Sequence, residues 1–158
     1  MIFHLSIAAR EPARVANVLA EMWRGEVFPF PPVATGSFAV LAGDERNSLI
    51  EVYPLGTELV PAEGDADAGS LHNPAASGRS ATHAAIATPL GAEEVMAIAS
   101  REGWTAKYRK RGGMFGVVEL WLEDTTMLEL LTAEMQAEYL ATMTPEGWRG
   151  ALAAGPPA

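Results

Sequence analysis

The sequence predicts an α+β fold in which two βαβββ modules curl their sheets into a metal-binding cup. The order strand, helix, strand, strand, strand can be followed twice along the chain. Equivalent residues recur at an almost constant spacing, since 83 − 4 = 79 residues separate His4 from His83 and 129 − 51 = 78 separate Glu51 from Glu129. A period shared by the first and last strands of a module indicates an internal duplication.

The first module covers residues 1–55. Residues 2–8 form a short apolar strand, and Pro12 suits the first turn of the helix that follows, where its missing N–H costs nothing. Gly25 is expected to end this helix, as a glycine just beyond the last turn. One helical face carries Val15, Val18, Leu19, Met22 and Trp23, and three more strands are expected at residues 26–30, 37–41 and 48–53.

Residues 56–80 are expected to form a linker, because Gly, Ala, Ser and Asp dominate there and leave little to pack. The second module, residues 81–132, repeats the order of the first. Its helix presents Val95, Ile98 and Ala99 on one face and ends at Gly103. Its strands are expected at residues 82–88, 104–111, 115–122 and 127–131, and residues 133–158 form a C-terminal helix, broken at Pro145, and a tail.

The composition restricts the partners. Hydrophobic residues make up 49% of the chain and charged residues 20%, enough to build a buried core. The net charge is −9, from 11 basic and 20 acidic residues, so nucleic acid and anionic membranes are excluded as expected partners. The chain has no cysteine, no signal peptide is recognisable, and no apolar run approaches the roughly 18 residues that span a bilayer. A cytoplasmic location is therefore expected.

Each module places one His in its first strand and one Glu in its last. Because strand side chains alternate, His4 and Glu51 point away from the apolar face that needs the helix, as do His83 and Glu129. Glu129 stands in an apolar run, residues 127–131, where an unpaired carboxylate is costly to bury. Two imidazoles and two carboxylates suit a divalent ion such as Ni, Co, Zn, Mn or Fe, with positions left for a chelating substrate.

Paired βαβββ modules with His, Glu, His and Glu at these places resemble the vicinal oxygen chelate superfamily, which includes glyoxalase I, bleomycin-resistance proteins and extradiol dioxygenases. The resemblance covers residues 1–132 and implies that His4, Glu51, His83 and Glu129 bind the metal. It further implies a homodimer and a lyase or isomerase acting on a small molecule with two adjacent oxygens. Glu129 or Glu51 would then move protons. The four-ligand set is most similar to that of glyoxalase I.

Two positions differ from glutathione-dependent glyoxalases. Ala8 and Leu55 stand where those enzymes usually carry Arg and Asn, and the turn at residues 123–126 lacks their usual Asp-Pro-Asp-Gly pattern. A glutathione-dependent reaction is therefore not expected. Two alternatives stay open beside the glyoxalase-like enzyme. One is a non-catalytic protein of the same fold that binds a drug or another small molecule, and the other is a ring-cleaving dioxygenase.

Three further residues are candidates for contacts with the substrate. Tyr53 lies on the same strand face as Glu51, where it either lines the cleft or packs beside it. Arg109 and Arg111 alternate with opposite-facing Lys110 on one strand. They form either a docking surface for a carboxylate or phosphate, or an edge strand protected by charge. Glu119 is expected to face solvent, and it ranks below Glu129 as a base.

Overall fold

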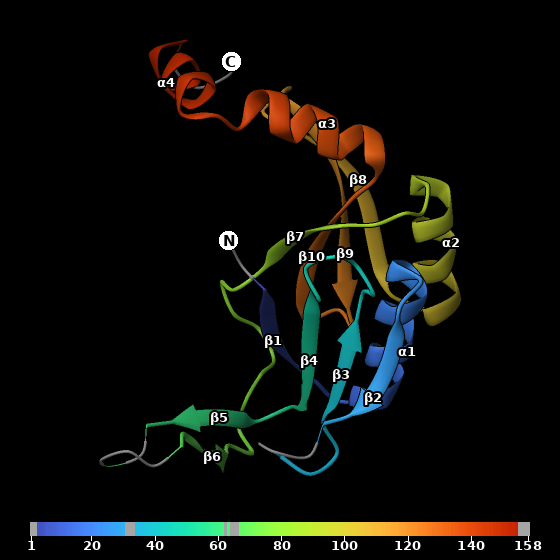
Figure 1. Ribbon diagram of the computed structural model, residues 1–158, viewed down its shortest axis with the longest axis vertical. Coiled ribbons are helices and arrows are strands. Elements are labelled where there is room, and N and C mark those ends of the chain that lie inside the picture. Colours follow the sequence, from blue (N-terminus) through green and yellow to red (C-terminus); the bar gives the residue numbers. More distant parts are fainter. Residues whose placement is uncertain (1–2, 31–33, 62, 64–66, 155–158) are drawn as a thin grey trace. The chain divides into compact units, whose positions relative to one another are not determined.

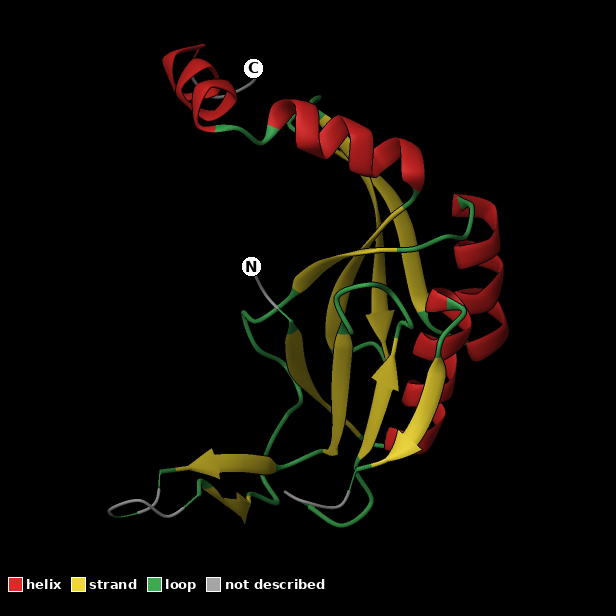
Figure 2. Cartoon of the chain, viewed as in Figure 1, coloured by secondary structure: helices red, strands yellow, loops and turns green. Residues whose placement is uncertain are grey.

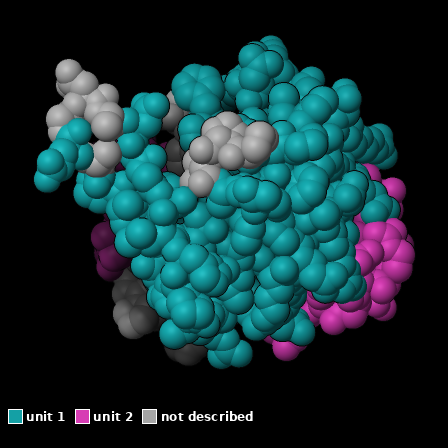
Figure 3. All heavy atoms as spheres, turned by 90° about the horizontal axis from the view of Figure 1, so that it is seen from below, with its two compact units in different colours: residues 1–83, 121–127 teal, residues 84–120, 128–158 magenta. Residues whose placement is uncertain are grey.

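The structure is a computed structural model that describes residues 3–30, 34–61, 63 and 67–154. It contains two compact units (Figure 3). Unit 1 comprises residues 1–83 and 121–127, and unit 2 comprises residues 84–120 and 128–158. Residue 2 of the first predicted strand and residues 155–158 of the predicted tail lie outside the described residues.

Unit 1 contains the first predicted module. Its four-stranded sheet has the order β1-β4-β3-β2, and β1 runs parallel to β4 (Figure 1). Helix α1 packs on the face that carries Ile50 and Val52, both 0% exposed, and Glu51 points to the other face. The elements are β1 (His4–Ala9), α1 (Pro12–Trp23), β2 (Glu26–Pro29), β3 (Phe38–Leu41) and β4 (Leu49–Pro54).

The end of α1 differs from the sequence expectation in its geometry. Arg24, not Gly25, adopts the left-handed conformation at the helix end, with φ 53°. The N–H groups there reach the carbonyls of Ala20 and Glu21. Gly25 is required for a different reason, because a Cβ at this position would lie 2.1 Å from the carbonyl oxygen of Leu41 on β3. This glycine therefore permits a close approach of helix end and sheet.

The turn between β9 (Phe115–Leu122) and β10 (Thr126–Leu131) belongs to unit 1 and contacts the start of α1. The carboxylate of Glu123 accepts the backbone N–H of Arg10 at 2.6 Å and that of Glu11 at 2.8 Å. A helix N-terminus exposes N–H groups without partners and carries partial positive charge. Glu123 therefore supplies the cap that the side chain of Glu11 does not give.

Part of the predicted linker, residues 56–80, forms a pair of strands, although its composition predicts that it has little to pack. Strands β5 (Thr57–Val60) and β6 (Gly69–His72) form an antiparallel hairpin, drawn in yellow in Figure 2. Gly56, at φ +91°, lies so close to Asn73 that a Cβ would meet its carbonyl oxygen at 2.4 Å. The Asn73 amide donates to Glu58 at 2.6 Å. Local composition missed this pairing because the two strands have only four residues each and stand in a segment rich in Gly, Ala, Ser and Asp.

The second module lies mostly in unit 2, and residues 121–127, where β9 ends and β10 begins, belong to unit 1. Its sheet has the same strand order, β7-β10-β9-β8, and the same parallel pair, β7 with β10. The predicted helix face is confirmed, since Val95, Ile98 and Ala99 are buried. Gly103 ends this helix at φ 75°, as expected. The elements are β7 (Ala84–Ala87), α2 (Ala92–Glu102), β8 (Thr105–Arg111), β9 (Phe115–Leu122) and β10 (Thr126–Leu131).

The C-terminal region forms two helices, α3 (Ala133–Thr142) and α4 (Pro145–Ala154). The Thr132 side chain caps α3 by accepting the N–H of Met135. Pro145 begins α4, in agreement with a helix interrupted at this residue. No helix in the described part of the chain is long and apolar enough to cross a bilayer. The duplicated α+β architecture with two curled four-stranded sheets is confirmed.

Candidate functional site

Glu51 is a half-buried carboxylate of unit 1 that is held by two hydroxyl groups. In the parallel pairing of β1 and β4, Ser6 lies directly beside Glu51, on the face opposite α1. The Ser6 hydroxyl donates to Glu51 Oε2 at 2.6 Å, and the Tyr53 hydroxyl donates to the same oxygen at 2.7 Å. Oε1 of Glu51 makes no hydrogen bond within the described residues. Because no buried side-chain nitrogen or oxygen among them lacks a partner, Oε1 is open to solvent.

Tyr53 is only 5% exposed, although it lies on the face away from α1. Its burial and its hydrogen bond to Glu51 raise the pKa of Tyr53 to about 12. The phenol therefore stays protonated near neutral pH and acts as a donor to Glu51. The two interpretations left open for Tyr53 are both met, since it is packed and also lines a pocket.

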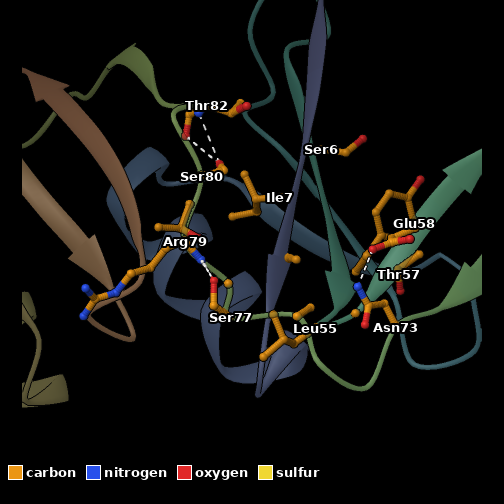
Figure 4. Close-up of a pocket in the computed structure, with 16 residues that line it drawn as sticks. Ser6, Ile7, Leu55, Thr57, Glu58, Asn73, Ser77, Arg79, Ser80 and Thr82 are labelled. Carbon is orange, nitrogen blue, oxygen red and sulfur yellow. Dashed lines mark hydrogen bonds between the residues drawn. The ribbon is translucent and has the colours of Figure 1, made fainter.

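The pocket lies within unit 1 and has a volume of about 380 Å³. Ser6 and Tyr53 belong to its wall, so the wall includes both hydroxyls that hold Glu51. In Figure 4, Ser6 points to the side of β1 on which Glu58 and Asn73 lie, and Ser80 and Thr82 lie on the other side. Most of the remaining wall comes from the predicted linker and the residues next to it: Leu55, Gly56, Thr57, Glu58, Asn73, Ala76, Ser77, Gly78, Arg79, Ser80 and Thr82.

Glu129 is the buried carboxylate of unit 2, with 8% exposure. Nε of Arg111 donates to Glu129 Oε1 at 2.9 Å, and Nη2 of Arg111 contacts the same oxygen. The same Nη2 donates to Glu119 Oε1 at 2.7 Å. The two carboxylates raise the pKa of Arg111, with the bond to Glu129 as the main cause. Arg111 thus supplies the counter-charge that the buried Glu129 needs within unit 2.

Glu119 and Arg109 complete this group. The Glu119 side chain is only 16% exposed, and its Oε2 lies 3.7 Å from Nε of Arg109. The expectation that Glu119 faces solvent is therefore wrong, because strands β8, β9 and β10 are neighbours and bring Arg111, Glu119 and Glu129 together. That Arg109 and Arg111 bind an anionic substrate stays a prediction.

The two histidines lie at the starts of equivalent strands. His4 is the exposed first residue of β1. His83 is exposed and immediately precedes β7 instead of belonging to it, and its Nδ1 is 3.1 Å from the carbonyl of Ala81. Within the described part of each unit, no three His, Asp or Glu side chains form a group that could hold a metal. Ligation by His4, Glu51, His83 and Glu129 stays a prediction.

The chemistry of the donor residues fits a divalent metal. Glu51 has one carboxylate oxygen held by hydroxyl groups, and Glu129 has one held by Arg111. The other oxygen of each makes no hydrogen bond among the described residues. A carboxylate held at one oxygen and free at the other is suited to bind a metal through a single oxygen, with a hydrogen-bonded neighbour fixing its orientation.

Ser6 and the wall formed by residues 73–82 were not identified from the sequence. Ser6 could have been found, because it shares the face of His4 and a parallel β1–β4 pairing places it beside Glu51. The wall offers no comparable signal. Its Ser77, Ser80 and Thr82 reach the pocket through loop geometry, which the sequence pattern does not indicate.

No protein-family model matches the sequence, and no curated protein matches it. Solved structures of similar fold include the fosfomycin resistance protein FosX from Mesorhizobium loti, with 14% identity over 87% of this chain and 95% of that chain and a TM-score of 0.51. FosX from Listeria monocytogenes, complexed with Mn(II) and sulfate ion, has 12% identity over 89% of this chain and 96% of that chain and a TM-score of 0.55.

These likenesses concern the fold. The FosX proteins are members of the vicinal oxygen chelate superfamily, whose fold the paired βαβββ modules resemble. The fold implied by the duplicated sequence is therefore confirmed by the solved structures. It places the first and last strands of each module side by side, β1 with β4 and β7 with β10, with His4 in β1 and His83 immediately before β7.

Proposed function

We propose that this protein is a metal-dependent enzyme, of lyase or isomerase type, that acts on a small substrate with two adjacent oxygens. The observation that carries this proposal is the arrangement of Glu51. Its carboxylate is fixed at one oxygen by Ser6 and Tyr53, free at the other, and joined through these hydroxyls to the wall of a pocket. A fixed carboxylate beside a pocket is the arrangement that proton transfer requires.

The proposed metal ligands are His4, Glu51, His83 and Glu129. When bound, a divalent ion would polarise the substrate oxygens as a Lewis acid. A FosX neighbour forms a complex with Mn(II), which supports a divalent ion for this fold without identifying the native metal. The free oxygens of Glu51 and Glu129 support the same proposal.

Of the two carboxylates, Glu51 is the better candidate for moving protons. Its neighbours Ser6 and Tyr53 are neutral hydroxyl groups, which can pass a proton on or hold it in a hydrogen bond. Glu129 instead contacts Arg111, a guanidinium that does not give up its proton. We assign the accepting role to the Glu51 carboxylate and a substrate contact to Tyr53.

The pocket supports a small polar substrate. About 380 Å³ accommodates a compact ligand, and hydroxyl-bearing residues such as Ser6, Tyr53 and Thr57 belong to the wall. Ala8 and Leu55, which replace the two polar residues usual in glutathione-dependent glyoxalases, both line this pocket. Neither side chain can hydrogen-bond to a peptide ligand. We therefore expect the substrate not to be a glutathione adduct.

The test uses hydrogen–deuterium exchange at the carbon-bound protons of dihydroxyacetone in D2O, followed by NMR, with protein saturated with Mn²⁺ or Ni²⁺. We expect exchange by the natural protein to be at least about a hundredfold faster than by Glu51→Gln, because the amide can still offer an oxygen ligand but cannot accept the proton. Glu45→Gln, at an exposed turn, is the control and should match the natural protein.

Two outcomes would contradict the proposal. One is equal exchange by Glu51→Gln and the natural protein. The other is exchange no faster than with the free metal ion for every metal tried. The hemithioacetal of methylglyoxal and glutathione is included as a further probe, and it should not be turned over. Rapid turnover of this probe would show that Ala8 and Leu55 do not exclude glutathione.

A second candidate function is binding or modification of a drug, favoured by the FosX names of two structural neighbours. Expression of the chain in a fosfomycin-sensitive bacterium distinguishes this second candidate function from the first. Resistance that persists in Glu51→Gln would indicate sequestration without proton transfer. Unchanged susceptibility to fosfomycin would remove this drug from consideration.

A further inference from the structure

A single guanidinium in unit 2 serves two carboxylates on three neighbouring strands. Arg111 ends β8, Glu119 lies on β9 and Glu129 lies on β10, and the sheet order is β10-β9-β8. Nη2 of Arg111 contacts Oε1 of both glutamates. The two carboxylates are therefore neighbours, and Arg111 lies between them.

Charge and burial make this arrangement asymmetric. The side chains of Glu129 and Glu119 are 10% and 16% exposed, whereas that of Arg111 is 36% exposed. The buried carboxylates need a counter-charge more than the guanidinium does. Two negative charges share Arg111, and Arg109 is the next cation, 3.7 Å from Glu119. Glu119 can thus hold Arg111 without any help from Glu129.

Only one oxygen of Glu129 is available to an additional cation. Both contacts from Arg111 fall on its Oε1, and Oε2 is open to solvent among the described residues. A divalent ion on Oε2 would lie close to the guanidinium. Like charges in a poorly solvated site repel strongly, so ion and guanidinium cannot share Glu129 without a cost.

We propose that Arg111 is a built-in competitor for the divalent ion: it neutralises Glu129 in the metal-free protein and moves onto Glu119 when the ion binds Glu129. This inference rests on the proposed role of Glu129 as a metal ligand. Glu119 is then the residue that receives the displaced guanidinium. Together Arg111 and Glu119 set how tightly the metal is held, without touching it.

Competition predicts opposite effects from two substitutions. Arg111→Gln removes the competing cation, so the affinity for Mn²⁺ or Zn²⁺ should rise at least about tenfold. Glu119→Gln removes the acceptor of the displaced guanidinium, so the affinity should fall by a similar factor. If Arg111 only positioned Glu129, its removal would weaken binding instead. The opposite signs therefore distinguish competition from a structural role.

The experiment is calorimetric titration of metal-free protein with Mn²⁺ and with Zn²⁺. Lys107→Gln, which removes an exposed positive charge from the same strand, controls for the charge change in Arg111→Gln. Glu93→Gln, on the exposed surface of α2, does the same for Glu119→Gln. Both controls should stay within about twofold of the natural protein. Thermal unfolding of each variant verifies that it is folded.

A second readout follows Arg111 directly. In the natural protein, the NMR signal of its Nε–H should move when Zn²⁺ is added, because this group donates to Glu129. Equal or weaker metal affinity in Arg111→Gln, or an unmoved Nε–H signal in the metal-bound protein, would overturn this inference. The proposed metal site would stand. Absence of metal binding in every variant would overturn the proposed metal site as well. Binding in Arg111→Gln but not in the natural protein would support competition.

Discussion

Glu51 and Glu129 occupy equivalent positions in the two modules, yet their neighbours hold them with different chemistry. Hydroxyl groups from β1 and β4 fix Glu51, whereas a guanidinium from β8 fixes Glu129. The duplicated fold thus carries two carboxylates with different electrostatic surroundings. Such a difference is what a site needs if one carboxylate is to move protons and the other is to stay ionised.

At Tyr53 the same local chemistry gives a prediction on stability. Its pKa is about 12 in the folded protein, above the ordinary value of 10.0, so folding favours the protonated phenol. This contribution is complete below pH 10 and is lost as the pH rises toward 12. The free energy of unfolding of the natural protein should therefore fall more steeply over this range than that of Tyr53→Phe, by on the order of 2 kcal/mol.

Urea unfolding curves of both proteins between pH 9 and about 12 measure this difference. The comparison with Tyr53→Phe cancels the titration of lysines, which both proteins share. Parallel pH profiles of the two proteins would show that Tyr53 is not held by burial and by Glu51 as the structure indicates.

Among the elements, α1 depends on a residue far away in sequence. Glu123 accepts two backbone N–H groups at the start of this helix. Glu123→Gln keeps one acceptor oxygen but loses the negative charge that complements the helix dipole. We expect a loss of about 1 kcal/mol in the free energy of unfolding, measured by thermal and chemical denaturation. Glu45→Gln, which removes an exposed charge elsewhere in unit 1, should leave stability unchanged, and equal stability of both variants would contradict this cap.

The elements show which features a sequence can reveal. Helix faces and alternating strands are local patterns, and those around α2 and β9 were predicted almost to their ends. The hairpin of β5 and β6 was missed because each strand has only four residues and the surrounding segment is rich in small and polar residues. The partner of Glu129 was missed for a different reason. An apolar run around a carboxylate predicts that it needs compensation, but only the strand order shows that Arg111 provides it.

At the scale of the whole molecule, the edge strands of the two sheets bear on whether chains associate. In each sheet the first strand of the module has one hydrogen-bonded neighbour, so β1 and β7 are edge strands among the described residues. Exposed edges present unpaired N–H and C=O groups and favour association. A two-fold dimer covers the same surface on both subunits and closes the assembly.

We therefore expect a homodimer in solution, in keeping with the resemblance to paired-module enzymes. Light scattering coupled to size exclusion should give twice the chain mass, 2 × 16.8 = 33.6 kDa, at micromolar concentration. The mass should not increase further at higher concentration, because a two-fold interface pairs one surface of each subunit with the same surface of its partner. A mass of one chain throughout the range would refute the dimer and leave the fold untouched. A mass that keeps rising with concentration would indicate open-ended association through these edges.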